Sequence, residues 1–126
     1  MTNRVVLRIR TFTAVVVLTG WLTTASGLSI GEREALGQDF AQCAAYFFNA
    51  AKAKPMSDYE TLYGAAEVAF NRAKRMLGSE EAERLMADAS SEISAIMGGD
   101  WLNFARVEVR FSGHCTELIN REVEKK

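Results

Sequence analysis

Histidine, proline and cysteine are nearly absent from this chain, whose 126 residues include one histidine, one proline and two cysteines. With His114 as the only imidazole, the chain cannot form a metal site built from several histidines. Covalent haem attachment is excluded because there is no Cys-x-x-Cys-His motif. The sequence also has no glycine-rich phosphate loop and no Ser/His/Asp signature. We therefore expect that the protein is not an enzyme.

Acidic residues are absent from the first 30 positions, although the whole chain has 16. Three arginines, Arg4, Arg8 and Arg10, precede an uncharged stretch over residues 11–30, which contains the small residues Ala25-Ser26-Gly27. A basic start, an apolar centre and small residues at the end are typical of a secretory signal peptide. We expect residues 1–27 to be this peptide, with cleavage near Gly27 and export to the periplasm by the general secretory route.

An uncleaved anchor is the alternative for residues 1–27, because about 20 uncharged residues are just enough to span a bilayer. Beyond this segment the chain keeps 12 of its 15 basic residues against 16 acidic ones, so its net charge is −4. That balance gives no electrostatic reason to bind nucleic acid or an anionic membrane. Membrane contact is therefore expected only through residues 1–27, and only if the signal is retained.

Residues 28–126 are long enough for a single domain. A domain of this size is only marginally stabilised by the burial of its own apolar surface. In an exported chain the two cysteines, Cys43 and Cys115, predict one disulfide. The bridge would close most of the mature chain into a loop, for which the loss of chain entropy on unfolding is worth about 4 kcal/mol.

The segment from Asp39 to Ala51 has the spacing of a central helix. Apolar residues recur at steps of three and four, which places them on one helix face; they are Leu36, Phe40, Cys43, Phe47 and Ala51. Tyr46 and Phe48 lie roughly 100° to either side, so the apolar arc is wider than one neighbouring helix could cover. We interpret these aromatic residues as core rather than as a cofactor site.

A second helix is predicted from Asp58 to Leu77. Pro55 ends the first helix, because it lacks an amide donor and disfavours helical geometry at the residue before it. The sequence Ser57-Asp58-Tyr59-Glu60 is a candidate capping box for the second helix. Gly78 is expected to end this helix in a left-handed conformation.

A third helix is predicted directly after Gly78, with Ser79 as its cap and Gly98-Gly99 as its end. Glu80, Glu81 and Glu83 occupy its first turn, where the helix dipole favours negative charge, so this acidic cluster needs no catalytic explanation. The turn between the second and third helices is short enough to make the two a hairpin.

A fourth helix is predicted after Asp100, a good capping residue. Its apolar residues step by three or four along the chain; they are Phe104, Val107, Phe111, Cys115 and Leu118. Residues 105–111 also alternate between apolar and charged, as a strand would, but a lone strand has no partner to pair with. We therefore favour the helix there, followed by a charged, fraying tail from Arg121 to Lys126.

Together these patterns predict an all-α fold, a small antiparallel bundle of about four helices stapled by one disulfide. Cys43 and Cys115 each lie among large apolar residues, so the first and last helices should be neighbours.

Two polar groups could indicate a function. His114 and Glu117 share a helix face but lack a second pair of ligands, so no metal site is expected. The basic run from Asn71 to Arg75 could dock an acidic partner, but its cations also complement the end of a helix dipole, and we favour that structural explanation.

The leading hypothesis is a non-catalytic periplasmic binding or interaction protein, such as an inhibitor, adaptor or chaperone-like helper, whose partner is another protein. The alternative is a carrier of haem or a hydrophobic small molecule. The chain is similar in size, in predicted compartment and in number of predicted helices to the four-helix periplasmic b-type cytochromes. Those proteins ligate iron with a methionine near the mature N-terminus and a histidine near the C-terminus. His114 matches loosely, but the first methionine after the signal, Met56, lies beyond the first helix. No cofactor is therefore assigned.

Overall fold

The computed structural model describes residues 27–124 of the chain. The predicted signal peptide or anchor at residues 1–27 therefore lies outside the described residues, except for Gly27. The chain divides into two units between Arg33 and Glu34, and the second unit contains the helical core. None of the described helices is long and apolar enough to cross a membrane.

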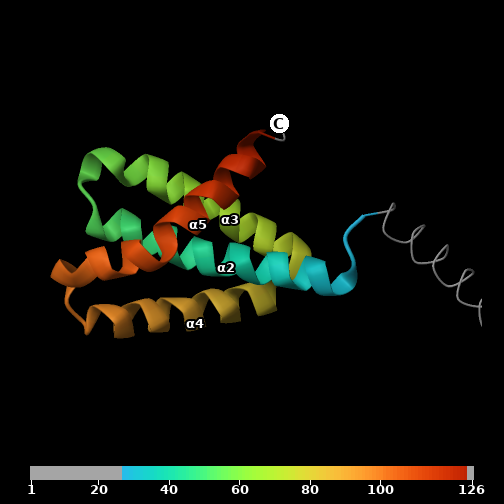
Figure 1. The fold of residues 1–126 in the computed structure, drawn as a ribbon, viewed down its shortest axis with the longest axis horizontal. Helices are drawn as coiled ribbons and strands as arrows, with labels where there is room; N and C mark the ends of the chain where they lie inside the picture. The colour runs from blue at the N-terminus through green and yellow to red at the C-terminus, as the bar shows by residue number, and fades with distance from the viewer. Residues whose placement is uncertain (1–26, 125–126) are drawn as a thin grey trace, which may run out of the picture. The chain divides into compact units, whose positions relative to one another are not determined.

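Four α-helices make up the described chain, and two short 3-10 turns, η1 and η2, precede the second and the fourth of them. Their bounds are α2 Ile30–Ala53, η1 Met56–Asp58, α3 Tyr59–Leu77, α4 Ser79–Met97, η2 Trp101–Asn103 and α5 Phe104–Glu124. Successive helices run in opposite directions and pack together (Figure 1). The prediction of an all-α antiparallel bundle is confirmed. Residues 105–111 lie inside α5, so the strand alternative is wrong there.

A serine caps a helix at Ser29, before α2, and the capping box predicted at Ser57 does not form. The Ser29 hydroxyl accepts a hydrogen bond from the Glu32 amide at 3.1 Å and donates one to the Glu32 carboxylate, also at 3.1 Å. Ser57 is inside η1, and no side chain caps the start of α3. The chain tightens into η1 directly after Pro55, so Ser57 already has helical neighbours and does not stand before the first free amide.

The ends of the helices follow the glycines, with corrections at Gly78, Ser79 and Asp100. Gly98 is left-handed at φ 62° and ends α4, so the predicted break there is confirmed. The Asp100 carboxylate accepts a 3.0 Å hydrogen bond from the Leu102 amide and is therefore a cap, but of η2 rather than of α5, the fourth described helix. Gly78 ends α3 with a positive φ of 88°, but its ψ of 156° lies outside the left-handed helical region that was predicted. Because that single residue turns the chain, Ser79 is the first residue of α4 and not its cap.

The central position of the first helix is confirmed, because α2 contributes more buried residues than any other described helix. Phe40 and Cys43 are almost completely buried, and the alanines between the aromatic residues are buried as well. Small side chains on several sides of α2 let the neighbouring helices approach its backbone closely. Gly37 shows the limit of this approach, since an added Cβ would lie 2.7 Å from Leu77 Cγ.

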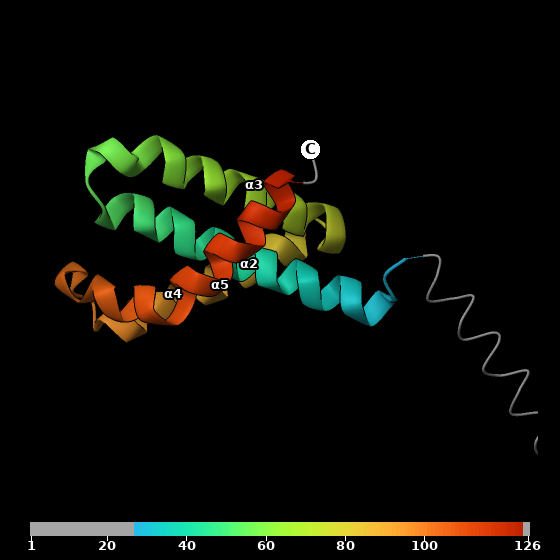
Figure 2. The ribbon, with the colours of Figure 1, turned by 45° about the horizontal axis from the view of Figure 1, so that its top comes forward.

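The C-terminal part of the chain is more regular than predicted. Residues 121–124 continue α5, where a fraying tail was expected, and only residues 125 and 126 lie outside the description. Arg72 Nε of α3 lies 2.9 Å from a Glu122 carboxylate oxygen, and this contact ties the last turns of α5 to α3. Figure 2 shows the same end of α5 beside α3.

Candidate functional site

The two cysteines form the predicted disulfide between α2 and α5. The S–S distance is 2.08 Å, the Cα–Cα distance is 5.3 Å, and neither residue has exposed surface. The bond lies within the normal Cα range for a disulfide, so the helices need no displacement to form it. Its burial makes it a structural bond, out of reach of an exchanging thiolate.

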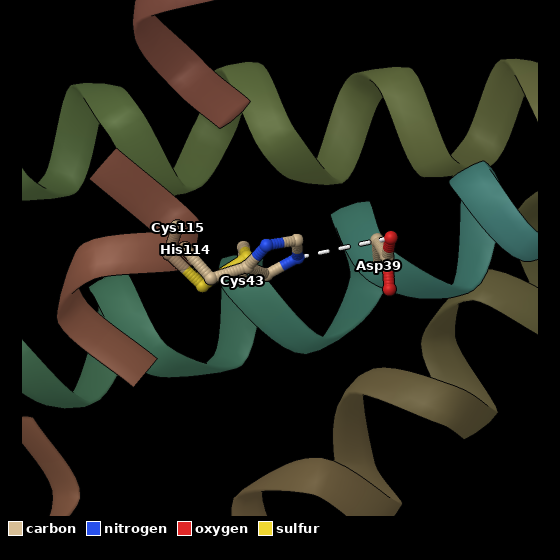
Figure 3. The surroundings of a disulfide bond; sticks show 4 residues. All are labelled: Asp39, Cys43, His114 and Cys115. Atoms are coloured by element: carbon tan, nitrogen blue, oxygen red, sulfur yellow. Dashed lines mark ion pairs between the residues drawn. A yellow bond between two sulfur atoms is a disulfide. The ribbon is translucent and has the colours of Figure 1, made fainter. Parts of the chain in front are cut away.

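His114 lies next to this disulfide, and its ring points toward Asp39 (Figure 3). Its Nε2 atom is 3.7 Å from a carboxylate oxygen of Asp39, and the two side chains are 53% and 45% exposed. The contact is an ion pair only when the imidazole is protonated. Among residues 27–124 no three histidine, cysteine or acidic side chains come together in a group that could hold a metal. The structure thus brings His114 to Asp39 of α2 rather than into a metal-binding constellation.

The basic run of α3 is partly engaged with the bundle itself. Arg72 pairs with Glu122 across the helices, although its Nε atom lacks the alignment of a hydrogen bond. Lys74 lies over the ring of Phe70 at 4.6 Å from the centroid. These two cations have intramolecular partners, which favours the structural explanation over a docking patch.

The aromatic residues of α2 pack against each other and against α5. Tyr46 stacks on Phe104 and on Phe111, with 6.1 Å between ring centroids in both pairs, and meets Phe47 edge-on at 5.2 Å. Phe48 meets Tyr63 of α3 edge-on at 5.3 Å. Offset and edge-on pairs at these distances are the favourable aromatic geometries. The interpretation of the aromatic segment as core agrees with these contacts.

An open cleft lies where α2, α3 and α5 meet, and its volume is about 320 Å³. Its lining includes the apolar residues Phe47 and Ala50 of α2 and residues that carry hydroxyl groups, namely Tyr46 of α2, Thr61 of α3, and Ser112 and Thr116 of α5. Pockets for small ligands commonly combine an apolar surface with a few placed polar groups. We call this feature the three-helix cleft.

The charged residues of the three-helix cleft come from three different segments. Lys54, just after α2, lies 2.7 Å from a Glu108 carboxylate oxygen of α5, and Asp58 at the end of η1 also lines the cleft. The hydrogen bond to Glu108 raises the pKa of Lys54 above its ordinary value, although desolvation opposes the shift. Both side chains remain about one-third exposed, so the pair is accessible from solvent.

The three-helix cleft was not predicted from the sequence. Its residues come from positions 46 to 116 and share no motif, and Lys54 has no signal of its own in the sequence beyond its place before Pro55. One signal was present, because Glu108, Ser112 and Thr116 recur at steps of four and therefore form a polar stripe along one face of α5. Such a stripe cannot be told from an ordinary solvated face until the neighbouring helices are in place.

A second surface feature is a set of exposed apolar side chains on two connections. Met56, between α2 and α3, is 83% exposed, and Trp101 and Leu102, between α4 and α5, are 46% and 90% exposed. Both connections lie at the same end of the bundle (Figures 1 and 2). We call these three residues the apolar end.

No protein-family model, curated protein or solved structure matches this chain. Within residues 27–124 the fold and its surface define a class: a small antiparallel bundle of four helices, joined by a disulfide, with a polar cleft where α2, α3 and α5 meet and an apolar end.

Proposed function

We propose that this chain is an exported, non-catalytic interaction protein that contacts another protein in the periplasm through its apolar end. The observation that supports the proposal is the exposure of Leu102 and Met56, 90% and 83%. Large apolar side chains gathered on one part of a surface mark interaction sites more often than isolated ones do. Their burial against a partner would contribute roughly 1.5 to 3 kcal/mol for each side chain.

The α4–α5 connection holds its apolar residues in a fixed geometry. The Leu102 amide donates to the Asp100 carboxylate at 3.0 Å, and the Asn103 side-chain amide donates to the Met97 carbonyl at 3.0 Å. Trp101 stacks on Phe104 with 6.3 Å between the ring centroids. A pre-ordered turn loses less conformational entropy on binding, and tryptophan is enriched among residues that dominate interfaces. These contacts support a surface organised for binding.

The carrier alternative has less support. The aromatic residues that suggested a haem or hydrophobic-ligand site stack on one another, and His114 lies beside Asp39 with half of its side chain exposed. We therefore place the binding activity at the apolar end. We propose that the chain has no catalytic role.

The apolar end is tested by Leu102→Asp and Met56→Asp, made singly and together. We expect each change to weaken binding to the periplasmic partner at least tenfold, which corresponds to about 1.4 kcal/mol, because a carboxylate would have to be desolvated in the interface. The partner is identified by cross-linking of the full chain in cells, and affinities are then measured by calorimetry with the purified pair.

Two matched variants serve as controls for this experiment. Val123→Asp places the same charge at another exposed apolar position, 59% exposed in the last turn of α5, and should leave the affinity unchanged. His114→Ala should also bind within about tenfold of wild type. If Val123→Asp or His114→Ala weakens binding as much as Leu102→Asp does, the interface is elsewhere and the proposal is wrong.

Export is a separate part of the proposal. The disulfide is compatible with an oxidising compartment such as the periplasm. Intact-mass analysis of protein recovered from the periplasmic fraction should show a chain that starts near Ser26 or Leu28. A mass that retains residues 1–21 would show that the N-terminal segment is an uncleaved anchor.

A further inference from the structure

Tyr46 lines the three-helix cleft and carries a hydroxyl group. The residue is only 4% exposed, and within residues 27–124 its hydroxyl makes no hydrogen bond. Among the described residues, Arg72 Nε is the one buried side-chain polar atom without a hydrogen-bond partner, so the Tyr46 hydroxyl keeps contact with solvent. A ligand in the cleft can replace that water as the partner of the hydroxyl.

The charges of the three-helix cleft are arranged as an exchangeable pair. Lys54 and Glu108 come from separate elements, meet at 2.7 Å and stay about one-third exposed. Such a pair gives little stability to a bundle, because both ions remain partly hydrated. A ligand with an ammonium and a carboxylate group can therefore replace each ion's partner, so that one ion pair is exchanged for two.

The size and lining of the cleft limit what the ligand can be. A volume of about 320 Å³ is that of roughly ten water molecules at about 30 Å³ each, which suits a molecule of about ten non-hydrogen atoms. The lining combines the apolar Phe47, Ala50 and Leu62 with the hydroxyl-bearing Thr61, Ser112 and Thr116. An apolar ligand side chain would contact the first group, and the polar ends of the ligand would contact the second.

We propose that the three-helix cleft binds a small zwitterion of the amino-acid class, with Lys54 binding the ligand carboxylate and Glu108 binding the ligand ammonium. Asp58 supplies a second carboxylate for the ammonium, and the Tyr46 hydroxyl donates to the ligand carboxylate. The site is distinct from the apolar end and does not depend on the function proposed there.

The Lys54–Glu108 pair distinguishes a zwitterion from a simple anion or cation. A ligand with only a carboxylate would pair with Lys54 but leave Glu108 without its cation. A ligand with only an ammonium would pair with Asp58 and leave the Lys54–Glu108 pair as it is. Only a ligand with both charges exchanges that pair for two ion pairs, and a charge that a bound ligand covers without pairing is costly.

The test uses calorimetric titration of the full oxidised protein with L-leucine, L-phenylalanine and L-threonine, and with N-acetyl-L-leucine and L-leucinamide as ligands that each lack one charge. We expect at least one free amino acid to bind, and we expect the two blocked leucines to bind at least tenfold more weakly than L-leucine. Lys54→Met and Glu108→Gln should each reduce binding at least tenfold. Tyr46→Phe, which removes only the unpaired hydroxyl, should reduce binding severalfold and leave the melting temperature unchanged.

Glu92→Gln is the matched control, since it breaks a similar ion pair, Glu92 with Arg110 at 2.6 Å, between α4 and α5 and away from the cleft. It should leave amino-acid binding unchanged, as should Leu102→Asp at the apolar end. Failure of every free amino acid to bind at millimolar concentration would overturn the proposal. Equal binding of blocked and free leucine, or equal losses in Glu92→Gln and Lys54→Met, would overturn it too.

Discussion

Removal of the Cys43–Cys115 disulfide, by the double substitution Cys43→Ala and Cys115→Ala, should lower the free energy of unfolding by about 2 to 5 kcal/mol. The bond joins residues 72 positions apart in the sequence, so it restricts most of the described chain when the protein unfolds. By the entropy of loop closure alone this restriction is worth about 4 kcal/mol. Small domains are commonly stable by only about 5 to 15 kcal/mol, so the change removes a large share.

Packing adds to this loss. Both sulfur atoms are inaccessible to solvent, and the cysteines lie in the core that α2 shares with α5. Alanine leaves the volume of each sulfur unfilled, and an unfilled core volume costs further free energy. The neighbouring ion pair of Asp39 and His114 cannot compensate, because both of its side chains are about half exposed.

Thermal and urea unfolding of the double variant and of wild type measure this effect. For a domain of this size, each kcal/mol lowers the melting temperature by roughly 4 to 8 °C. Adding a reductant should lower the melting temperature of wild type but not that of the double variant, which has no bond to reduce. If wild type melts at the same temperature when thiol counting shows both cysteines reduced, the bond does not stabilise the fold.

The arrangement of the helices could be predicted because it depends on signals within each segment. Apolar residues at steps of three and four gave the buried faces of α2 and α5, and Pro55, Gly78 and Gly98 gave the breaks between helices. The disulfide followed from having only two cysteines in a chain with a signal-like N-terminus. These features need no knowledge of which helices touch, apart from the inference that α2 and α5 are neighbours.

The predictions of a capping box at Ser57 and of a fraying tail after Arg121 were wrong because local sequence signals were weighed without the contacts that decide between them. Ser57 and Ser29 both precede a glutamate by three residues, and only Ser29 stands before a free helix start, because Pro55 draws Ser57 into η1. The charged residues after Arg121 suggested a loose tail, but the Arg72–Glu122 ion pair holds that segment against α3. A single sequence cannot rank such local signals against contacts made with distant residues.

The candidate sites depended on the assembled helices. Tyr46 was correctly assigned to the core, yet its place in the lining of a cleft depends on how α3 and α5 pack against α2. Lys54 and Glu108 lie far apart in the sequence, on different helical segments, and nothing in their neighbouring sequence links them. The exposed Leu102 likewise follows from η2, a turn that helix periodicity does not predict.

Replacing Tyr46 by alanine should also be severely destabilising, with a loss of about 3 to 5 kcal/mol in the free energy of unfolding. The ring is 4% exposed and lies in contact with the rings of Phe47, Phe104 and Phe111. Alanine removes three aromatic pairs, each worth about 0.5 to 1.5 kcal/mol beyond the area buried, and leaves a cavity between α2 and α5. Urea unfolding followed by circular dichroism measures the loss.

Tyr46→Phe is the control that separates the ring from the hydroxyl. It keeps all three ring contacts, and because the hydroxyl has no hydrogen bond within the described chain, stability should change by less than about 1 kcal/mol. We therefore expect wild type and Tyr46→Phe to have nearly equal free energies of unfolding, and Tyr46→Ala to have a much lower one. If Tyr46→Phe is destabilised as strongly as Tyr46→Ala, the hydroxyl has an essential structural partner, and its assignment to ligand binding in the three-helix cleft is wrong.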